Sequence, residues 1–349
     1  MTLSDALINP DENLPGQDLP FTPPRGIKGW TEHYAFFAYD ADTAYGVFIH
    51  IGRVPDDPTI WRGTIQVYLP GADMLVAKYF GRDGDESSAG AGPLRVRCEQ
   101  PFRRFVAEFD GMVQRTTRQA ITSEVVKDTL SEWVKLRVVF DAAAPIHGKQ
   151  EEKKDRADGS FHTEQIGRIT GEITVAGKKI ALSGTGVRDH SSGVREYGKV
   201  VSHQWIHGLF PSGFAFSALM YRTTTNPEAR AVNIFRGDGT PLEYVELVEH
   251  SEYPDLDTSP GVFKADPLED PHFRSGRLVL KTSKSPLSIQ WQLVHTHAIT
   301  YVDPCEELNG TDRSRPNAVQ MCDAPAIFTC NGERGVGLFE RSARIRVLG

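Results

Sequence analysis

The chain of 349 residues is 39% hydrophobic and 24% charged, a balance typical of globular proteins, and it is long enough for two domains. Its net charge of -7 and its lack of a basic tract argue against a nucleic-acid partner. No apolar run approaches the roughly 20 residues of a membrane-spanning helix, so we expect no stable membrane insertion.

The N-terminal arm, residues 1–28, is acidic and rich in proline and shows no periodicity. It lacks the basic start and apolar centre of a signal peptide, and we therefore expect a cytoplasmic protein. The four cysteines contain no CxxC pair, which argues against a structural zinc site and favours reduced thiols. A disulfide between Cys322 and Cys330 stays open as the alternative.

The first half of the chain is predicted to form short strands separated by turns rich in glycine or aspartate. The runs 30–39 and 45–51 flank Asp40–Thr43, a predicted hairpin turn. Helical spacing of apolar residues predicts a helix over residues 123–132. Alternating apolar residues predict further strands at 61–69, 75–80, 94–98, 102–109, 112–118 and 133–140.

A hairpin over residues 167–182 leads into the segment 184–195, after which a second set of strands begins. These strands are predicted at 201–209, 214–222, 231–236, 243–249, 277–281, 287–297 and 335–347. The Pro- and Asp-rich stretches 251–273 and 302–324 are predicted to be long connections that cover a cavity mouth.

This succession of short strands separated by turns predicts an all-β fold of antiparallel barrels or sandwiches with few short helices. The two halves repeat the same coarse architecture on either side of the segment 184–195. We therefore expect an N-terminal arm over residues 1–28 and two β-domains, at residues 29–185 and 186–349.

The segment Gly184–Arg195 concentrates charged groups and glycines beside predicted strands. In an extended chain Arg188 and His190 share one face and Asp189 lies on the other. If Asp189 points into an apolar barrel, burial raises its pKa and makes it a general acid near neutral pH. The alternative is an ion-pair cluster of Asp189 with Arg188 and Arg195 that joins two domains.

His203, Trp205 and His207 project from one face of a predicted strand and suit a ligand-binding lumen, or alternatively a half-exposed strand face. His295 and His297 share a face of another strand. Together the four histidines are an alternative metal site, although an HxH pattern alone is weak and we expect no metal.

Glu32 and Tyr34 share one face of the first strand and are candidate pocket residues, with rim and core positions as the alternative. Phe216 is a candidate lining residue on the strand 214–222. His162-Thr163-Glu164-Gln165 is a further candidate for the same site. The chain contains no GxSxG, no P-loop and no GxGxxG between a strand and a helix.

Two runs of residues carry a resemblance to a known family. They are His162-x-x-Gln165-x-Gly167-Arg168-Ile169-x-Gly171 and Gly184-x-Gly186-x-Arg188-Asp189-His190-Ser191-x-Gly193-x-Arg195. Together with Trp30-x-Glu32-x-Tyr34 and Gly52-Arg53-x-Pro55, they resemble the AttH-like superfamily related to carotenoid 1,2-hydratase (hydroxyneurosporene synthase). The resemblance covers most of residues 28–349, and it is strong at the central motif and diffuse beyond about residue 225.

The resemblance implies two lipocalin-like domains, hydrophobic ligands such as isoprenoids or polyketide-like chains, and a cofactor-independent hydratase or cyclase. It also implies that Asp189 is the proton donor. Two residues depart from the family pattern: Ser192 replaces the usual tryptophan, and Val187 replaces the tyrosine of the carotenoid hydratases. These departures argue against carotenoid hydration itself.

We therefore expect a cofactor-independent lyase or isomerase that hydrates, dehydrates, isomerises or cyclises a hydrophobic small molecule. Asp189 or a nearby histidine (His190 or His203) is expected to act as acid or base, with Arg188 and Arg195 as orienting groups. Trp205, His207, Tyr34, Glu32, Phe216, His295 and His297 are expected to bind the substrate. The alternative function is a non-catalytic lipocalin-like carrier of a lipophilic ligand. Assembly into a homodimer is a further open alternative.

Overall fold

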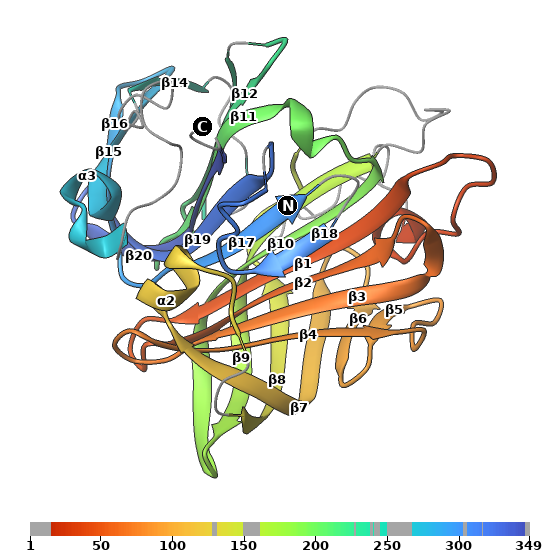
Figure 1. The fold of residues 1–349 in the computed structure, drawn as a ribbon. Helices are drawn as coiled ribbons and strands as arrows, with labels where there is room; N and C mark the ends of the chain where they lie inside the picture. Colours follow the sequence, from red (N-terminus) through yellow and green to blue (C-terminus); the bar gives the residue numbers. More distant parts are fainter. Residues whose placement is uncertain are drawn as a thin grey trace. The chain divides into compact units, whose positions relative to one another are not determined.

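The computed structural model describes residues 15–127, 131–148, 161–226, 228–237, 240, 245–249, 267–302, 306–315 and 317–345. The chain divides into two compact units. Unit 1 comprises residues 1–70, 75–115 and 129–195, and unit 2 comprises residues 71–74, 116–128 and 196–349. The expected all-β, lipocalin-like fold is confirmed, because each unit is built around one large antiparallel sheet (Figure 1). The expected domain boundaries stay a prediction.

Unit 1 begins with the 3-10 turn η1 (Pro15–Asp18) and contains ten strands in the order β4-β3-β2-β1-β10-β9-β8-β7-β6-β5. β4 also pairs with β7, so the sheet closes on itself. The strands are β1 (Trp30–Asp40), β2 (Tyr45–Val54), β3 (Asp57–Tyr68), β4 (Asp73–Gly81), β5 (Ser88–Ala91), β6 (Leu94–Gln100), β7 (Arg104–Thr117), β8 (Ser131–Ala142), β9 (Phe161–Val175) and β10 (Lys178–Val194).

The interior of unit 1 is filled by alternate residues of these strands, among them Phe36, Ile49, Phe105 and Phe140. Both predicted hairpins are confirmed: β1 pairs with β2, and β9 pairs with β10. The second turn uses Ala176 and Gly177 with φ of 50° and 76°. Two successive left-handed residues suit the twist of a tight hairpin.

Unit 2 has a sheet in the order β13-β12-β11-β20-β19-β16-β15-β14, and β17 pairs with β18 and β19. Its strands are β11 (Val200–Leu209), β12 (Ala215–Thr223), β13 (Ala229–Phe235), β14 (Val245–Glu249), β15 (Ser275–Thr282), β16 (Leu287–Leu293), β17 (His297–Val302), β18 (Glu306–Asn309), β19 (Val319–Cys330) and β20 (Glu333–Arg344). Its helical turns are α2 (Arg118–Ser123), η2 (Tyr197–Lys199), η3 (Pro267–Glu269) and α3 (Pro271–Arg274).

Two sequence expectations are wrong in position. The helix predicted over 123–132 lies at Arg118–Ser123, because the Thr117 hydroxyl caps it at Ala120 N and Glu124 is already extended. The connection predicted over 302–324 contains β18 and the start of β19. Residues 1–14 of the arm and 250–266 of the other predicted connection lie outside the described residues.

Cys98, Cys322 and Cys330 are buried free thiols, so the alternative of a disulfide between Cys322 and Cys330 is wrong. Cys305 lies outside the described residues. Among the parts of the chain that the structure describes, none of the helices has the length and apolar character needed to cross a membrane.

Candidate functional site

Strand β10 lies in the middle of the unit 1 sheet, between β1 and β9. The predicted alternation along it is confirmed. Arg188 and His190 point into the unit, where they stack on Phe105 and Tyr34 respectively. Asp189 points to the other face, as the side-chain period of two requires. Strand β10 therefore places Arg188 and His190 in the interior of unit 1 and Asp189 on the opposite face of the sheet.

Asp189 is hydrogen-bonded to His162 on the neighbouring strand β9, with 2.7 Å between Oδ2 and Nε2. The two residues are diagonal neighbours, because Asp189 pairs in register with Glu164 and Ser191 pairs with His162. The Ser191 hydroxyl lies 3.4 Å from Asp189 Oδ1 and accepts a hydrogen bond of 2.6 Å from Arg195. Arg195 thus reaches Asp189 through Ser191, as a positioning residue.

His162 is the group of this pair best placed to carry a proton. Burial opposes its charge, but the hydrogen bond and charge of Asp189, helped by Glu164, outweigh burial and raise the pKa of His162 above its usual 6.5. Its side chain is still 30% exposed. Glu164 is buried and lies 3.5 Å from both His162 Nε2 and His147 Nε2. These four side chains form an alternating series of carboxylates and imidazoles.

The alternative of an ion pair between Arg188 and Asp189 is wrong, because the two residues face opposite sides of β10. Arg188 instead binds the carboxylate of Asp18 through two hydrogen bonds of 2.8 and 2.9 Å. It also donates to Gln165 Oε1 on β9, at 3.0 and 2.8 Å. Arg188 is therefore bound within unit 1 and does not orient Asp189.

His190 is fully buried and lies 2.9 Å from Glu32 Oε1 through its Nε2 atom. Its ring stacks on Tyr34 at 4.1 Å and on Phe21 of the arm at 4.8 Å. Burial and the nearby charge of Glu32 raise the pKa of Tyr34 well above 10, so its phenol stays protonated. Glu32 also pairs with Arg53 at 2.8 Å. The structure thus brings Glu32, Tyr34 and His190 together, and a ring of the arm covers the imidazole.

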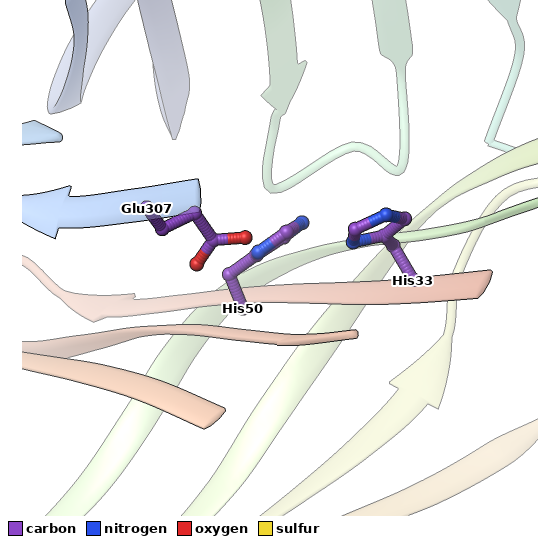
Figure 2. Close-up of side chains that lie close together, drawn as sticks. All are labelled: His33, His50 and Glu307. Carbon is purple, nitrogen blue, oxygen red and sulfur yellow. The ribbon is translucent and has the colours of Figure 1, made fainter. Parts of the chain in front are cut away.

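His33, on the opposite face of β1, stacks on His50 of β2 with ring centroids 4.9 Å apart (Figure 2). Only glycine fits at position 52, because a Cβ there would lie 2.2 Å from His33 Nδ1. Burial and the neighbouring charges of His50 and Arg195 lower the pKa of His33 well below 6.5. His33 is therefore neutral at physiological pH, in contrast to His162.

In unit 2, the face of the sheet opposite the apolar core holds a second set of ionisable groups. His203 on β11 lies 2.5 Å from Glu340 Oε1 on β20 through Nε2, and its Nδ1 lies 2.6 Å from the Ser342 hydroxyl. Glu340 pairs in register with Asp323 on β19, which pairs with His297 on β17. His297 Nε2 lies 3.0 Å from Asp323 Oδ2.

Asp323 and His297 are fully buried. Burial would raise the pKa of Asp323, but the neighbouring His297 and a hydrogen bond from Glu340 outweigh it and hold the pKa below 3.8. Two carboxylates directly opposite one another repel unless a proton or a cation lies between them. The four predicted histidines do not form one cluster, because β20 and β19 lie between β11, which carries His203 and His207, and β17, which begins at His297.

The remaining predicted residues of unit 2 occupy separate places. Trp205 shares the face of Glu340 and packs edge-on against His207, with centroids 4.5 Å apart. Phe216 lies in the apolar core, where its ring meets Phe328 at 5.1 Å. His295 accepts a hydrogen bond from the Thr296 amide, and burial lowers its pKa to about 4. Phe216 therefore does not share a face with Trp205.

Sequence reasoning gave no role to Asp18, Asp323 and Glu340, whereas Glu164 belongs to the candidate run 162–165. Asp18 stands in a proline-rich arm with no periodicity, and nothing local marks its partner 170 residues away. Asp323 carried a signal, because it is a carboxylate in a largely apolar strand run, whereas Glu340 is followed directly by Arg341 and Ser342. Burying a charge is costly unless it is paired, so such a position predicts a partner.

A sequence model of a family described as a domain of unknown function (DUF7064) matches residues 16–266. No curated protein sequence matches the chain. Several solved structures share the fold. An AttH-like protein from Nitrosomonas europaea is similar with a TM-score of 0.58 and 12% identity, over 91% of this chain and 93% of that one.

CghA, solved alone and with Sch210972, is similar with a TM-score of 0.52 and 10% identity, over 92% of this chain and 89% of that chain. Kievitone hydratase from Nectria haematococca is similar with a TM-score of 0.52 and 12% identity, over 91% of this chain and 89% of the hydratase. The expected AttH-like resemblance is confirmed as a similarity of fold.

Proposed function

The chain belongs to the family described as a domain of unknown function (DUF7064), and we propose that it is an enzyme of acid–base chemistry acting on a hydrophobic small molecule. The reaction class is hydration or dehydration, with isomerisation and cyclisation as related proton-dependent outcomes. The Asp189–His162 hydrogen bond carries the proposal. The fold shared with kievitone hydratase adds support by analogy of fold alone.

His162 acts as the general acid and Asp189 orients it. Because Asp189 holds the Nε2–H of the imidazolium, Nδ1 is the nitrogen that transfers a proton to the substrate. The raised pKa keeps His162 protonated near neutral pH, which suits a proton donor. Arg195 and Ser191 fix Asp189 in turn. Such general acid catalysis contributes about 100- to 10,000-fold in rate.

For hydration of an isoprenoid double bond, the His162 proton adds to one alkene carbon and leaves a carbocation on the other. The oxygen of a water molecule adds to that carbon, and the surplus proton of the water returns to the imidazole. Atoms and charge balance over the cycle, and no electrons are transferred. Dehydration is the reverse sequence, while isomerisation and cyclisation replace the water by loss of a proton or by attack of an internal double bond.

The His203–Glu340 and His297–Asp323 pairs of unit 2 are a second set of acid–base groups, and the predicted role of His203 stays a proposal. Trp205 beside them offers an aromatic surface for an unsaturated ligand.

The test is solvent-isotope incorporation with a panel of prenylated phenols incubated with the protein in D2O. Mass spectrometry of wild-type reactions should show deuterium in a product or in recovered substrate. His162→Gln and Asp189→Asn should lose this incorporation by about 100-fold or more. Asp141→Asn is the matched control, because Asp141 pairs with Arg104 on the exposed surface of the same unit.

The rival function is a carrier that binds and releases its ligand unchanged. The Asp189–His162 pair favours the enzyme, because a carrier needs only sparse polar anchors in an apolar lumen. Recovery of every panel compound bound but free of deuterium, from folded wild-type protein, would favour the carrier and reject the enzyme.

A further inference from the structure

The pairing of Asp18 with Arg188 joins the N-terminal arm to the interior of unit 1. Asp18 is fully buried and Arg188 is 1% exposed. The two carboxylate oxygens accept hydrogen bonds of 2.8 and 2.9 Å from the two terminal nitrogens of Arg188. The backbone amide of Phe102 donates to Asp18 Oδ2 as well. This is the two-point geometry in which guanidinium groups recognise carboxylates.

The groups that receive the carboxylate all belong to the sheet or its loops, whereas the carboxylate comes from the arm. Arg188 is held in place by Gln165 Oε1, and Gln165 is held in turn by the carbonyls of Phe102 and Ala144. The guanidinium lies 4.2 Å from the centroid of the Phe105 ring. The receiving side is therefore a preformed carboxylate site that does not depend on the arm for its shape.

An apolar space adjoins this site. The Phe105 and Phe140 rings under the guanidinium also line the cavity of about 10 Å³, together with Phe36 and Ile49. Leu19, which follows Asp18, packs against the same apolar core. The arm thus presents a carboxylate followed by an apolar side chain to a site made of a cation and apolar rings.

The described part of the arm, residues 15–28, joins neither sheet and contains the 3-10 turn η1. Its polar contacts include those of Phe21, whose amide donates to Glu32 and whose carbonyl accepts from Arg53. A segment that is attached without strand pairing is displaced more readily than a paired strand. A competing acid that binds the site would shift the arm toward release.

We propose that Arg188, Gln165 and the Phe102 amide form a binding site for an apolar carboxylic acid within unit 1, and that Asp18 occupies it as an intramolecular competitor. The ligand class follows from the site: one carboxylate for the guanidinium and an apolar tail for the space vacated by Leu19. The site goes beyond the acid–base function, because it lies on the face of β10 opposite Asp189. The arm is then an autoinhibitory plug.

The test uses full-length protein and two probes that differ in charge, sodium octanoate and octanamide, with affinity measured by isothermal titration calorimetry. Removing a competitor raises the apparent affinity by the inverse of the fraction of sites that were open. Asp18→Ala should therefore bind octanoate about tenfold or more tightly than the wild type. Octanamide should bind both proteins weakly and equally.

Asp141→Ala is the matched control. Asp141 binds Arg104 with the same two-point geometry, at 2.8 and 3.0 Å, but on the exposed surface of unit 1. The octanoate affinity of the Asp141→Ala variant should equal that of the wild type. Adding Arg188→Gln to Asp18→Ala should abolish the gain in octanoate affinity. If Asp18→Ala does not fold, Asp18→Asn replaces it, because asparagine keeps the size of the side chain.

Equal octanoate affinity in the wild type and the Asp18 variant would overturn the proposal. So would a gain in octanamide binding as large as the gain in octanoate binding, since the site would then select bulk and not charge. Because neither probe is a substrate and Asp189 is untouched, these outcomes are independent of the proposed enzymatic activity.

Discussion

The carboxylate of Asp189 and the imidazole of His162 face each other across paired strands, with 2.7 Å between Oδ2 and Nε2. The pair lies on the side of β10 opposite Arg188, and a serine–arginine link steadies the carboxylate. A histidine held in this way keeps its proton to higher pH than a free one. Both the predicted pH dependence of activity and the catalytic proposal depend on the raised pKa of His162.

Activity should fall on the alkaline side, because His162 must be protonated to act as an acid. Its folded pKa is raised above 6.5, so the acid form dominates at neutral pH and is lost as pH rises through the folded pKa. The same sign holds for stability: the contribution of His162 is full below pH 6.5 and disappears as pH rises through the raised value. The pH–rate profile of kcat/KM checks this, and Asp189→Asn should move the alkaline limb to lower pH.

A profile whose alkaline limb does not move in Asp189→Asn would show that another group titrates. Asp141→Asn is the control and should leave the limb unchanged, because Asp141 pairs with Arg104 instead.

The buried pair of Asp323 and His297 should contribute strongly to the stability of unit 2. Asp323→Asn leaves His297 without its charged partner at 0% exposure, and breaking such a pair costs about 3–5 kcal/mol. Because the folded pKa of Asp323 is lowered, the contribution persists above pH 3.8 and is lost as pH falls through the folded value. Urea unfolding followed by tryptophan fluorescence gives the free energy of unfolding.

Glu246→Gln is the control for that measurement. Glu246 lies 3.6 Å from Lys281, both side chains are about half exposed, and an exposed pair is worth about 0–1 kcal/mol. If Asp323→Asn lost no more stability than Glu246→Gln, the prediction that the buried pair stabilises unit 2 more than an exposed pair would be wrong.

Gly52→Ala should destabilise unit 1 by displacing His33. The new Cβ would lie 2.2 Å from His33 Nδ1, so the ring must leave its stack on His50. Overpacking of this kind costs about 1–3 kcal/mol. Thermal unfolding measures it, and the double variant Gly52→Ala/His33→Ala should recover most of the cost. Non-recovery would mean that the backbone, and not the imidazole, requires glycine at position 52.

The described cysteines should resist thiol reagents in the folded protein. Burial raises the pKa of Cys98 to about 12 and raises that of Cys322 and Cys330 as well. The reactive thiolate is then scarce at pH 8. A chromogenic disulfide reagent should detect at most one of the four cysteines before denaturation and all four after it. Rapid labelling of more than one cysteine in the native protein would contradict the burial.

The sequence predicts much of this structure where the pattern is local. Strand periodicity alone places Arg188 and His190 on one face and Asp189 on the other, and it predicts the β9–β10 hairpin. It does not find Asp18, because a contact across 170 residues leaves no local pattern. It also groups four histidines that the sheet order separates, since β20 and β19 lie between the strands of His203 and His297.

The most direct test of the central claim is the pKa of His162 itself, measured by nitrogen NMR of the histidine side chains across pH, with His162→Gln to assign the resonance. The account predicts a pKa above 6.5 in the wild type and a clear fall in Asp189→Asn, with no change in Asp141→Asn. A wild-type pKa at or below 6.5, or one that Asp189→Asn leaves unchanged, would contradict it.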